Sequence, residues 1–243
     1  MATQDDELVL QGGQTTASVV KVGNTVRRPM CANSAYVHEL LEYLDSVGFE
    51  GAPRLLGIDD RNREILTFID GWAPPDLEHC AWSEGQLIAA ARLLRHAHDV
   101  THGSALAGDM DVVCHGDPSP VNFIWRDGRP VALIDWDAAH PGERIQDVAY
   151  MAWMFVLGGG GDDTGYAGMT GRAQRLRVLC DAYDLDDRRD LIDAIEQEQT
   201  RVAAGIARDR GKRSPGRVAE VLAWVSGETA WLRANRVELT RFL

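Results

Sequence analysis

The sequence has no long hydrophobic run, few cysteines and a deficit of positive charge, and each absence excludes a class of protein. No apolar stretch approaches the roughly 20 residues of a membrane-spanning helix, so we expect no membrane partner. The acidic start lacks the basic and apolar regions of a signal peptide, which predicts a cytoplasmic location. The four cysteines form no C-x-x-C pair, which argues against a zinc site or a disulfide framework. A net charge of −12 argues against nucleic acid as a main partner.

The most informative pattern lies in residues 112–137. Three polar side chains, Asp117, Asn122 and Asp135, stand between short apolar runs, and Asp127-Gly128 is a hairpin signal. A hairpin at that point would return Asp135 close to Asn122. One carboxylate and one amide oxygen suit a hard cation such as Mg²⁺ that also keeps phosphate ligands. Asp117, just upstream, is placed to receive a proton from a hydroxyl.

Residues 115–122 (H-G-D-P-S-P-V-N) and 134–137 (I-D-W-D) resemble the catalytic and metal loops of the aminoglycoside phosphotransferase family. That family is similar in fold to protein kinases, whose H-R-D-x-x-x-x-N and D-F-G motifs keep the same order. The resemblance implies that Asp117 is the catalytic residue and that Asn122 and Asp135 hold Mg²⁺. It gives His115 a supporting role in the loop.

Residues 8–28 predict a β-meander with a glycine-rich turn, stopped by Pro29. By resemblance, this turn is the loop that holds the phosphates of ATP or GTP. By resemblance, Arg27 or Arg28 would take the place of the family's third-strand lysine. Strand alternation puts Val26 and Arg28 on one face and Arg27 on the other. We favour Arg28 because the family pattern has a small or apolar residue, here Val26, two positions before the cation. The predicted nucleotide-binding residues of this region are Gly12, Gly13, Thr15, Thr16 and Arg28.

Residues 34–47 predict a helix, in which the family places a glutamate that bonds the third-strand cation. The position at the expected spacing is Val37, so the partner of Arg28 stays open. Glu39 and Glu42 are predicted to face solvent. Two further strands follow, at residues 54–58 and 64–69. The second ends at the expected hinge, where Phe68 and Ile69 would meet the adenine.

The rest of the chain predicts mostly helices, near residues 83–102, 148–157, 171–183, 187–208 and 215–236. The histidines His96, His98 and His102 are interpreted as core or surface residues rather than metal ligands. Asp147, at the start of a helix, is expected to be structural. Many acidic side chains follow residue 181, and most are expected to be solvated. By resemblance, some of them could meet a cationic substrate.

These patterns predict an α+β, two-lobed, protein-kinase-like fold. A small antiparallel-sheet N-lobe would span residues 1–71, and a larger, mostly helical C-lobe for catalysis and substrate binding would span residues 72–243. The predicted reaction is Mg²⁺-dependent transfer of the γ-phosphoryl group of ATP or GTP to a hydroxyl of a small molecule. The acceptor could be an aminoglycoside, a macrolide, an amino alcohol or a sugar, and the acidic chain is compatible with a cationic one. A monomer or a homodimer is expected.

Two alternatives remain open from the sequence. The first is a catalytically impaired, kinase-like protein that binds nucleotide or small molecules, suggested by the arginine in place of lysine and by Val37. The second is a metal-dependent hydrolase that uses His115, Asp117, Asp135 and Asp137. The hydrolase has no use for Asn122 or for the glycine-rich hairpin.

Overall fold

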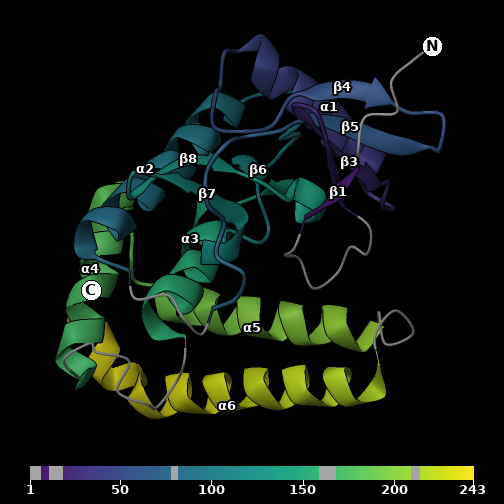
Figure 1. The fold of residues 1–243 in the computed structure, drawn as a ribbon. Coiled ribbons are helices and arrows are strands. Elements are labelled where there is room, and N and C mark those ends of the chain that lie inside the picture. Colours follow the sequence, from purple (N-terminus) through teal and green to yellow (C-terminus); the bar gives the residue numbers. More distant parts are fainter. Residues whose placement is uncertain (1–6, 11–18, 78–81, 159–167, 209–213) are drawn as a thin grey trace. The chain divides into compact units, whose positions relative to one another are not determined.

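The computed structural model describes residues 7–10, 19–77, 82–158, 168–208 and 214–243 (Figure 1). The chain divides into two compact units. The first contains Met1–Cys80 and Leu93–Glu143, and the second contains Ala81–Arg92 and Arg144–Leu243. Helix α2 (Glu84–Thr101) contributes residues to both units. No described helix combines the length and the apolar character that crossing a membrane requires.

The first unit is built on a five-stranded antiparallel sheet with the strand order β1-β2-β3-β5-β4. The tight turn between β2 and β3 places Gly23 at a φ of +57°, which glycine adopts without steric cost. The sheet contains the predicted meander and the two later strands. Its strands are β1 (Leu8–Val9), β2 (Val20–Val22), β3 (Thr25–Pro29), β4 (Leu55–Ile58) and β5 (Arg63–Thr67).

Helix α1 (Ser34–Ser46) contacts β4 and packs its apolar stripe into the core of this unit. Its buried apolar residues follow the helical spacing of the sequence: Val37, Leu40, Leu41 and Leu44. Glu39 and Glu42 are exposed, as predicted. The same unit holds two small antiparallel sheets, the hairpin β7–β8 and the strand pair β6–β9, together with two 3₁₀ turns. These elements are β6 (Val112–Cys114), η1 (Pro120–Asn122), β7 (Phe123–Arg126), β8 (Arg129–Leu133), η2 (Trp136–Ala138) and β9 (His140–Gly142).

The hairpin β7–β8 turns at Asp127 and Gly128, as the sequence predicts. Both residues have positive φ, +50° and +74°, which matches the left-handed turns that fit the twist of two-residue hairpins. Trp72 exchanges two backbone hydrogen bonds of 2.8 Å with Trp125 on β7. The N–H of Leu133 donates to the carbonyl of Gly51 at 2.8 Å. The hairpin is therefore fixed to other segments of the first unit.

The second unit is helical. Its core includes Trp153, which is fully buried and stacks on Trp224 with ring centroids 5.1 Å apart. Helices α5 and α6 run side by side (Figure 1). The elements of this unit are α3 (Arg144–Ala152), the π-helical turn η3 (Trp153–Leu157), α4 (Gly168–Tyr183), α5 (Leu191–Arg208) and α6 (Pro215–Thr240).

The structure differs from the predicted helices in several places: α4 begins at Gly168 and α6 extends to Thr240. The helix expected over 148–157 changes to π-helical winding at Trp153. The helix expected from residue 187 begins only at Leu191. There, the Asp187 carboxylate accepts a hydrogen bond of 3.2 Å from the N–H of Arg189, which stabilises a local turn in place of the first helical turn.

Candidate active site

The loop after β6 carries His115 and Asp117. His115 is fully buried, and its ring lies 4.5 Å from that of Trp136 between centroids. The N–H of Asp117 donates to His115 Nδ1 at 3.3 Å, so Nε2 carries the proton that it donates to the carbonyl of Ile134 at 3.0 Å. His115 therefore ties the loop to the end of β8 and holds the half-buried Asp117 beside it.

Asn122 and Asp135 lie close together because the hairpin β7–β8 brings the chain back to its start, as the sequence predicts. The N–H of Ile134 donates to the carbonyl of Asn122 at 2.9 Å, so Asp135 follows directly on this contact. The side-chain amide of Asn122 donates to the carbonyl of Asp117 at 2.9 Å. Asp135 has a left-handed backbone, with a φ of 63°, and its carboxylate is 41% exposed. An amide oxygen and an accessible carboxylate are donors that suit a hard divalent cation.

The backbone around these residues is packed closely. Gly116 has a φ of +80°, and a Cβ at this position would lie 2.4 Å from the carbonyl oxygen of Ala138. Asn33 donates two side-chain hydrogen bonds across this region, to the carbonyls of Asp137 (3.0 Å) and Ala139 (2.9 Å). The loop at Gly116 and the turn η2 thus lie against each other without room for another side chain at Gly116.

Arg28 joins this group from β3. It is only 8% exposed, and its terminal nitrogens donate to Asp135 at 2.8 Å and to Asp137 at 2.5 Å. Its Nε donates to Glu64. Burial alone would lower the pKa of Arg28, but the charges of Asp137, Glu64 and Asp135 outweigh it and raise that pKa. The pKa of Asp137 is raised by burial and by its acidic neighbours, although Arg28 acts in the opposite direction.

The alternation along β3 separates the two candidate arginines. Arg28 faces the carboxylates of Asp135 and Asp137. Arg27 instead has its Nη1 atom 3.6 Å from Asp59 Oδ2. The partner that the sequence left open for Arg28 is Glu64 on β5, whose second oxygen lies 2.7 Å from His38 Nε2. Sequence reasoning missed both residues because it searched for a glutamate only on α1. The signal was the pairing of β3 with β5, which places Glu64 directly opposite Arg28.

Of the other predicted nucleotide-binding residues, the structure describes only Phe68 and Ile69. Phe68 and Ile69 follow the end of β5 and are half-buried. The N–H of Phe68 donates to the carbonyl of Asn24 at 3.0 Å, and the Lys21 ammonium lies 3.6 Å from the Phe68 ring centroid. Gly12, Gly13, Thr15 and Thr16 lie outside the described residues.

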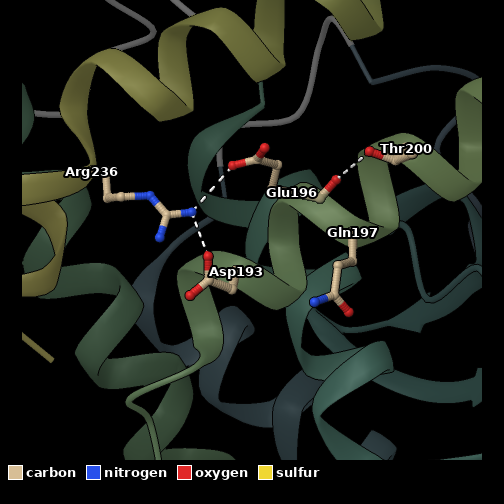
Figure 2. A pocket seen from close by; sticks show the side chains of 5 residues that line it. All are labelled: Asp193, Glu196, Gln197, Thr200 and Arg236. Carbon is tan, nitrogen blue, oxygen red and sulfur yellow. Dashed lines mark hydrogen bonds and ion pairs between the residues drawn. The ribbon is translucent and has the colours of Figure 1, made fainter.

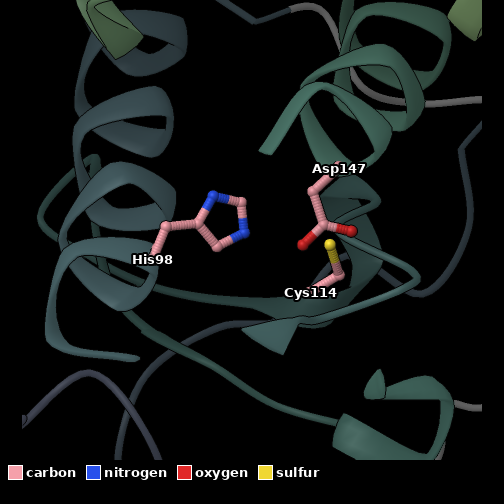
Figure 3. A group of neighbouring side chains, drawn as sticks. All are labelled: His98, Cys114 and Asp147. Carbon is pink, nitrogen blue, oxygen red and sulfur yellow. The ribbon is translucent and has the colours of Figure 1, made fainter. Parts of the chain in front are cut away.

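The histidines of α2 have separate environments. His96 packs edge-on against Phe49, and His102 bonds the carbonyl of Asp111. Figure 3 shows buried His98, whose ring lies within 4.8 Å of the Cys114 sulfur. The figure also draws Asp147, a buried residue in the first turn of α3 in the second unit.

The acidic residues of α5 are largely paired with arginines. Figure 2 shows a surface pocket lined by Asp193, Glu196, Gln197, Thr200 and Arg236. Arg236 contacts Asp193 at 2.6 Å and Glu196 at 3.1 Å, and Arg233 also donates to Glu196. Hydrogen bonds from these arginines lower the pKa values of Asp193 and Glu196. This cluster connects α5 to α6 and accounts for part of the acidic charge of the C-terminal half.

Comparison with known proteins places the chain in a family. The model of the phosphotransferase enzyme family matches residues 34–184. The trifolitoxin immunity protein of Rhizobium leguminosarum bv. trifolii is 30% identical over 260 residues, which cover 97% of this chain and 98% of that protein.

Two solved structures show the same fold at low identity. A choline/ethanolamine kinase family protein from Mesorhizobium loti has a TM-score of 0.63 at 15% identity, covering 98% of this chain and 92% of that one. Spectinomycin phosphotransferase in complex with ADP and spectinomycin has a TM-score of 0.60 at 11% identity, covering 98% and 93%. The predicted α+β kinase-like fold is confirmed, and the chain belongs to the phosphotransferase enzyme family.

Proposed function

We propose that the protein transfers the γ-phosphoryl group of ATP or GTP to a hydroxyl of a small molecule in a Mg²⁺-dependent reaction. The observation that carries the proposal is the convergence of Asp117, Asn122, Asp135 and Arg28 within one compact unit. Phosphoryl transfer needs positioning and neutralisation of charge more than covalent chemistry, and these four side chains supply both.

We assign to Asp117 the role of catalytic base. The acceptor oxygen forms a bond to the γ-phosphorus while the bond from that phosphorus to the nucleoside diphosphate breaks, and the hydroxyl proton passes to the Asp117 carboxylate. The hydrogen bonds of His115 and Asn122 to the backbone of this residue fix where the carboxylate stands. The base is therefore preorganised by the loop itself.

Asn122 and Asp135 would hold Mg²⁺, and their oxygen donors fit this ion. When bound, Mg²⁺ neutralises charge on the phosphate oxygens. Arg28 supplies a fixed positive charge beside Asp135 and is the residue that we assign to the nucleotide phosphates. The backbone and hydroxyls at Gly12, Gly13, Thr15 and Thr16 would add donors to those phosphates, and the segment at Phe68 and Ile69 would meet the base.

We assign residues 1–71 to nucleotide binding and residues 72–243 to catalysis and substrate binding. The nucleotide donor is in keeping with a cytoplasmic location. The 30% identical relative is a trifolitoxin immunity protein, which supports a screen that includes antibiotics and toxins beside amino alcohols and sugars. The spectinomycin phosphotransferase of similar fold forms a complex with ADP, which supports a nucleotide donor.

The test is a transfer assay with ATP or GTP, Mg²⁺ and a panel of hydroxyl compounds, read by mass spectrometry of the acceptor. We expect transfer by the wild type and a loss of about 100- to 10,000-fold in Asp117→Asn, the range typical of general acid–base catalysis. Nucleotide affinity should stay unchanged in this variant. The matched control is Asp109→Asn, a change at an exposed residue of the same unit, which should keep full activity.

Three outcomes would contradict the proposal. Transfer at the wild-type rate by Asp117→Asn would remove the proposed base. Nucleotide binding without transfer to any acceptor would favour the alternative of a binding protein. Hydrolysis without nucleotide would favour the metal-dependent hydrolase instead, but that reading gives no role to Arg28 or Asn122.

A further inference from the structure

We infer that Glu64 and His38 are positioning residues for Arg28 and that they replace the glutamate expected on α1. The inference rests on the proposed function, because it assumes that Arg28 holds the nucleotide phosphates. Val37, at the expected glutamate position, is 1% exposed and belongs to the apolar core. The cation therefore needs an anchor from elsewhere, and the structure provides one on β5.

The contact between Arg28 and Glu64 follows from the sheet. The two residues are directly opposite in the antiparallel pair β3–β5, so their side chains project from the same face. Glu64 is 1% exposed and accepts a hydrogen bond from Arg28 Nε. A carboxylate this deeply buried needs a charged or hydrogen-bonding partner, and a buried guanidinium needs the same.

His38 completes the anchor from α1. Its Nε2 lies 2.7 Å from the Glu64 oxygen that Arg28 Nε does not contact, so each carboxylate oxygen has its own partner. The connection from α1 to the cation of β3 is thus indirect and passes through β5. Replacing Glu64 would therefore remove the contact of Arg28 Nε and the contact of His38 Nε2 together.

The consequence for the site is the direction in which Arg28 points. Glu64 holds Nε, and the two terminal nitrogens are directed to Asp135 and Asp137. Because a guanidinium is planar, fixing Nε fixes the plane in which those terminal nitrogens lie. Glu64 thus sets the orientation of the cation at the predicted metal ligand, and it does so without touching the nucleotide.

The first arm of the test needs no nucleotide. In ¹⁵N NMR spectra, the Arg28 Nε–H signal, assigned by its absence in Arg28→Lys, should be shifted and protected from solvent exchange in the wild type. It should lose this protection in Glu64→Gln, which keeps the shape of the side chain but removes its charge. It should be unchanged in Glu39→Gln, a matched change at an exposed position of α1. An Arg28 signal that is the same in Glu64→Gln as in the wild type would overturn the inference.

The second arm separates positioning from simple structural support. Glu64→Gln should raise KM for the nucleotide by about 10- to 100-fold, the range found when a residue that orients a metal ligand is removed. KM for the acceptor should not change. A merely structural role would lower kcat through loss of active protein and leave both KM values unchanged, and that result would overturn the inference.

The third arm of the test uses two variants of His38 and covers the case in which Glu64→Gln does not fold. His38→Ala removes the half-buried partner of the second Glu64 oxygen, and it should raise KM for the nucleotide. His38→Gln keeps a donor near Glu64 and should restore most of the affinity. Equal KM values for these two variants and the wild type would contradict the relay. If the wild type binds no nucleotide, the proposed function fails, while the NMR arm still decides whether Glu64 holds Arg28.

Discussion

Replacing Gly116 by alanine tests whether the close packing of the catalytic loop matters. Gly116 has a φ of +80°, and the added Cβ would lie 2.4 Å from the carbonyl oxygen of Ala138. Gly128, at the β7–β8 turn, is the matched control, because its φ is +74° but nothing lies within 4 Å of its Cβ position. The two variants thus share the backbone conformation and differ in the space around the new methyl group.

The expected losses in the free energy of unfolding follow from this difference in space. A left-handed backbone costs a residue with a Cβ about 1–2 kcal/mol, and we expect Gly128→Ala to lower the free energy of unfolding by that amount. In Gly116→Ala, the new methyl group meets the backbone carbonyl of Ala138, which cannot rotate away as a side chain could. The loop and the turn η2 must separate by about 1 Å to reach ordinary contact, which adds packing strain of about 1–3 kcal/mol.

The activity should respond more strongly than the stability. Asp117 is the next residue, and a displacement of about 1 Å at a reacting group can lower the rate about 100-fold. Urea unfolding and the transfer assay, applied to both variants, measure the two effects. If Gly116→Ala matched Gly128→Ala in both stability and activity, the argument that this loop is sterically fixed would be refuted.

Three further predictions concern the packing of each unit. Burial raises the pKa of the Cys180 thiol to about 11, so the folded state keeps a proton that the unfolded state loses above about pH 8.5. The free energy of unfolding should therefore fall as the pH rises toward 11, and urea titrations should show a smaller fall in Cys180→Ala. Trp153→Ala should cost about 3–5 kcal/mol in the same assay, whereas Trp72→Ala, at a side chain that is 53% exposed, should cost far less; equal losses would contradict the assigned core. Asn33→Ala should cost about 1–3 kcal/mol, because the variant leaves two carbonyls near η2 without their donor, and it should also weaken binding of the Mg²⁺–nucleotide complex; unchanged unfolding would show that water replaces the amide.

Local patterns in the sequence predict much of the fold. The hairpin signal at Asp127-Gly128 is enough to bring Asp135 back to Asn122, because a two-residue turn fixes the register of its strands. The alternation along β3 is enough to separate Arg28 from Arg27. The buried stripe of α1 follows from its helical spacing. In each case, the interaction lies within a short segment.

The features that the sequence did not reveal depend on contacts between distant segments. Glu64 meets Arg28 because of the register between β3 and β5, and no local pattern specifies that register. His38 is recognisable as its partner only when α1 is placed beside the sheet. The close approach of Gly116 to Ala138 likewise requires the folded backbone. The resemblance to kinases predicts a glutamate on α1 as the partner of the cation, but this chain has Val37 at that position.

We propose above all that the unit containing Asn122 and Asp135 binds a nucleoside triphosphate together with Mg²⁺. The most direct measurement is calorimetric titration of ATP and GTP, with and without Mg²⁺, into the wild type and Asp135→Ala. We predict Mg²⁺-dependent binding of at least one nucleotide to the wild type and its loss in the variant. No binding of either nucleotide to the wild type, or equal binding by Asp135→Ala, would contradict the assignment of this site.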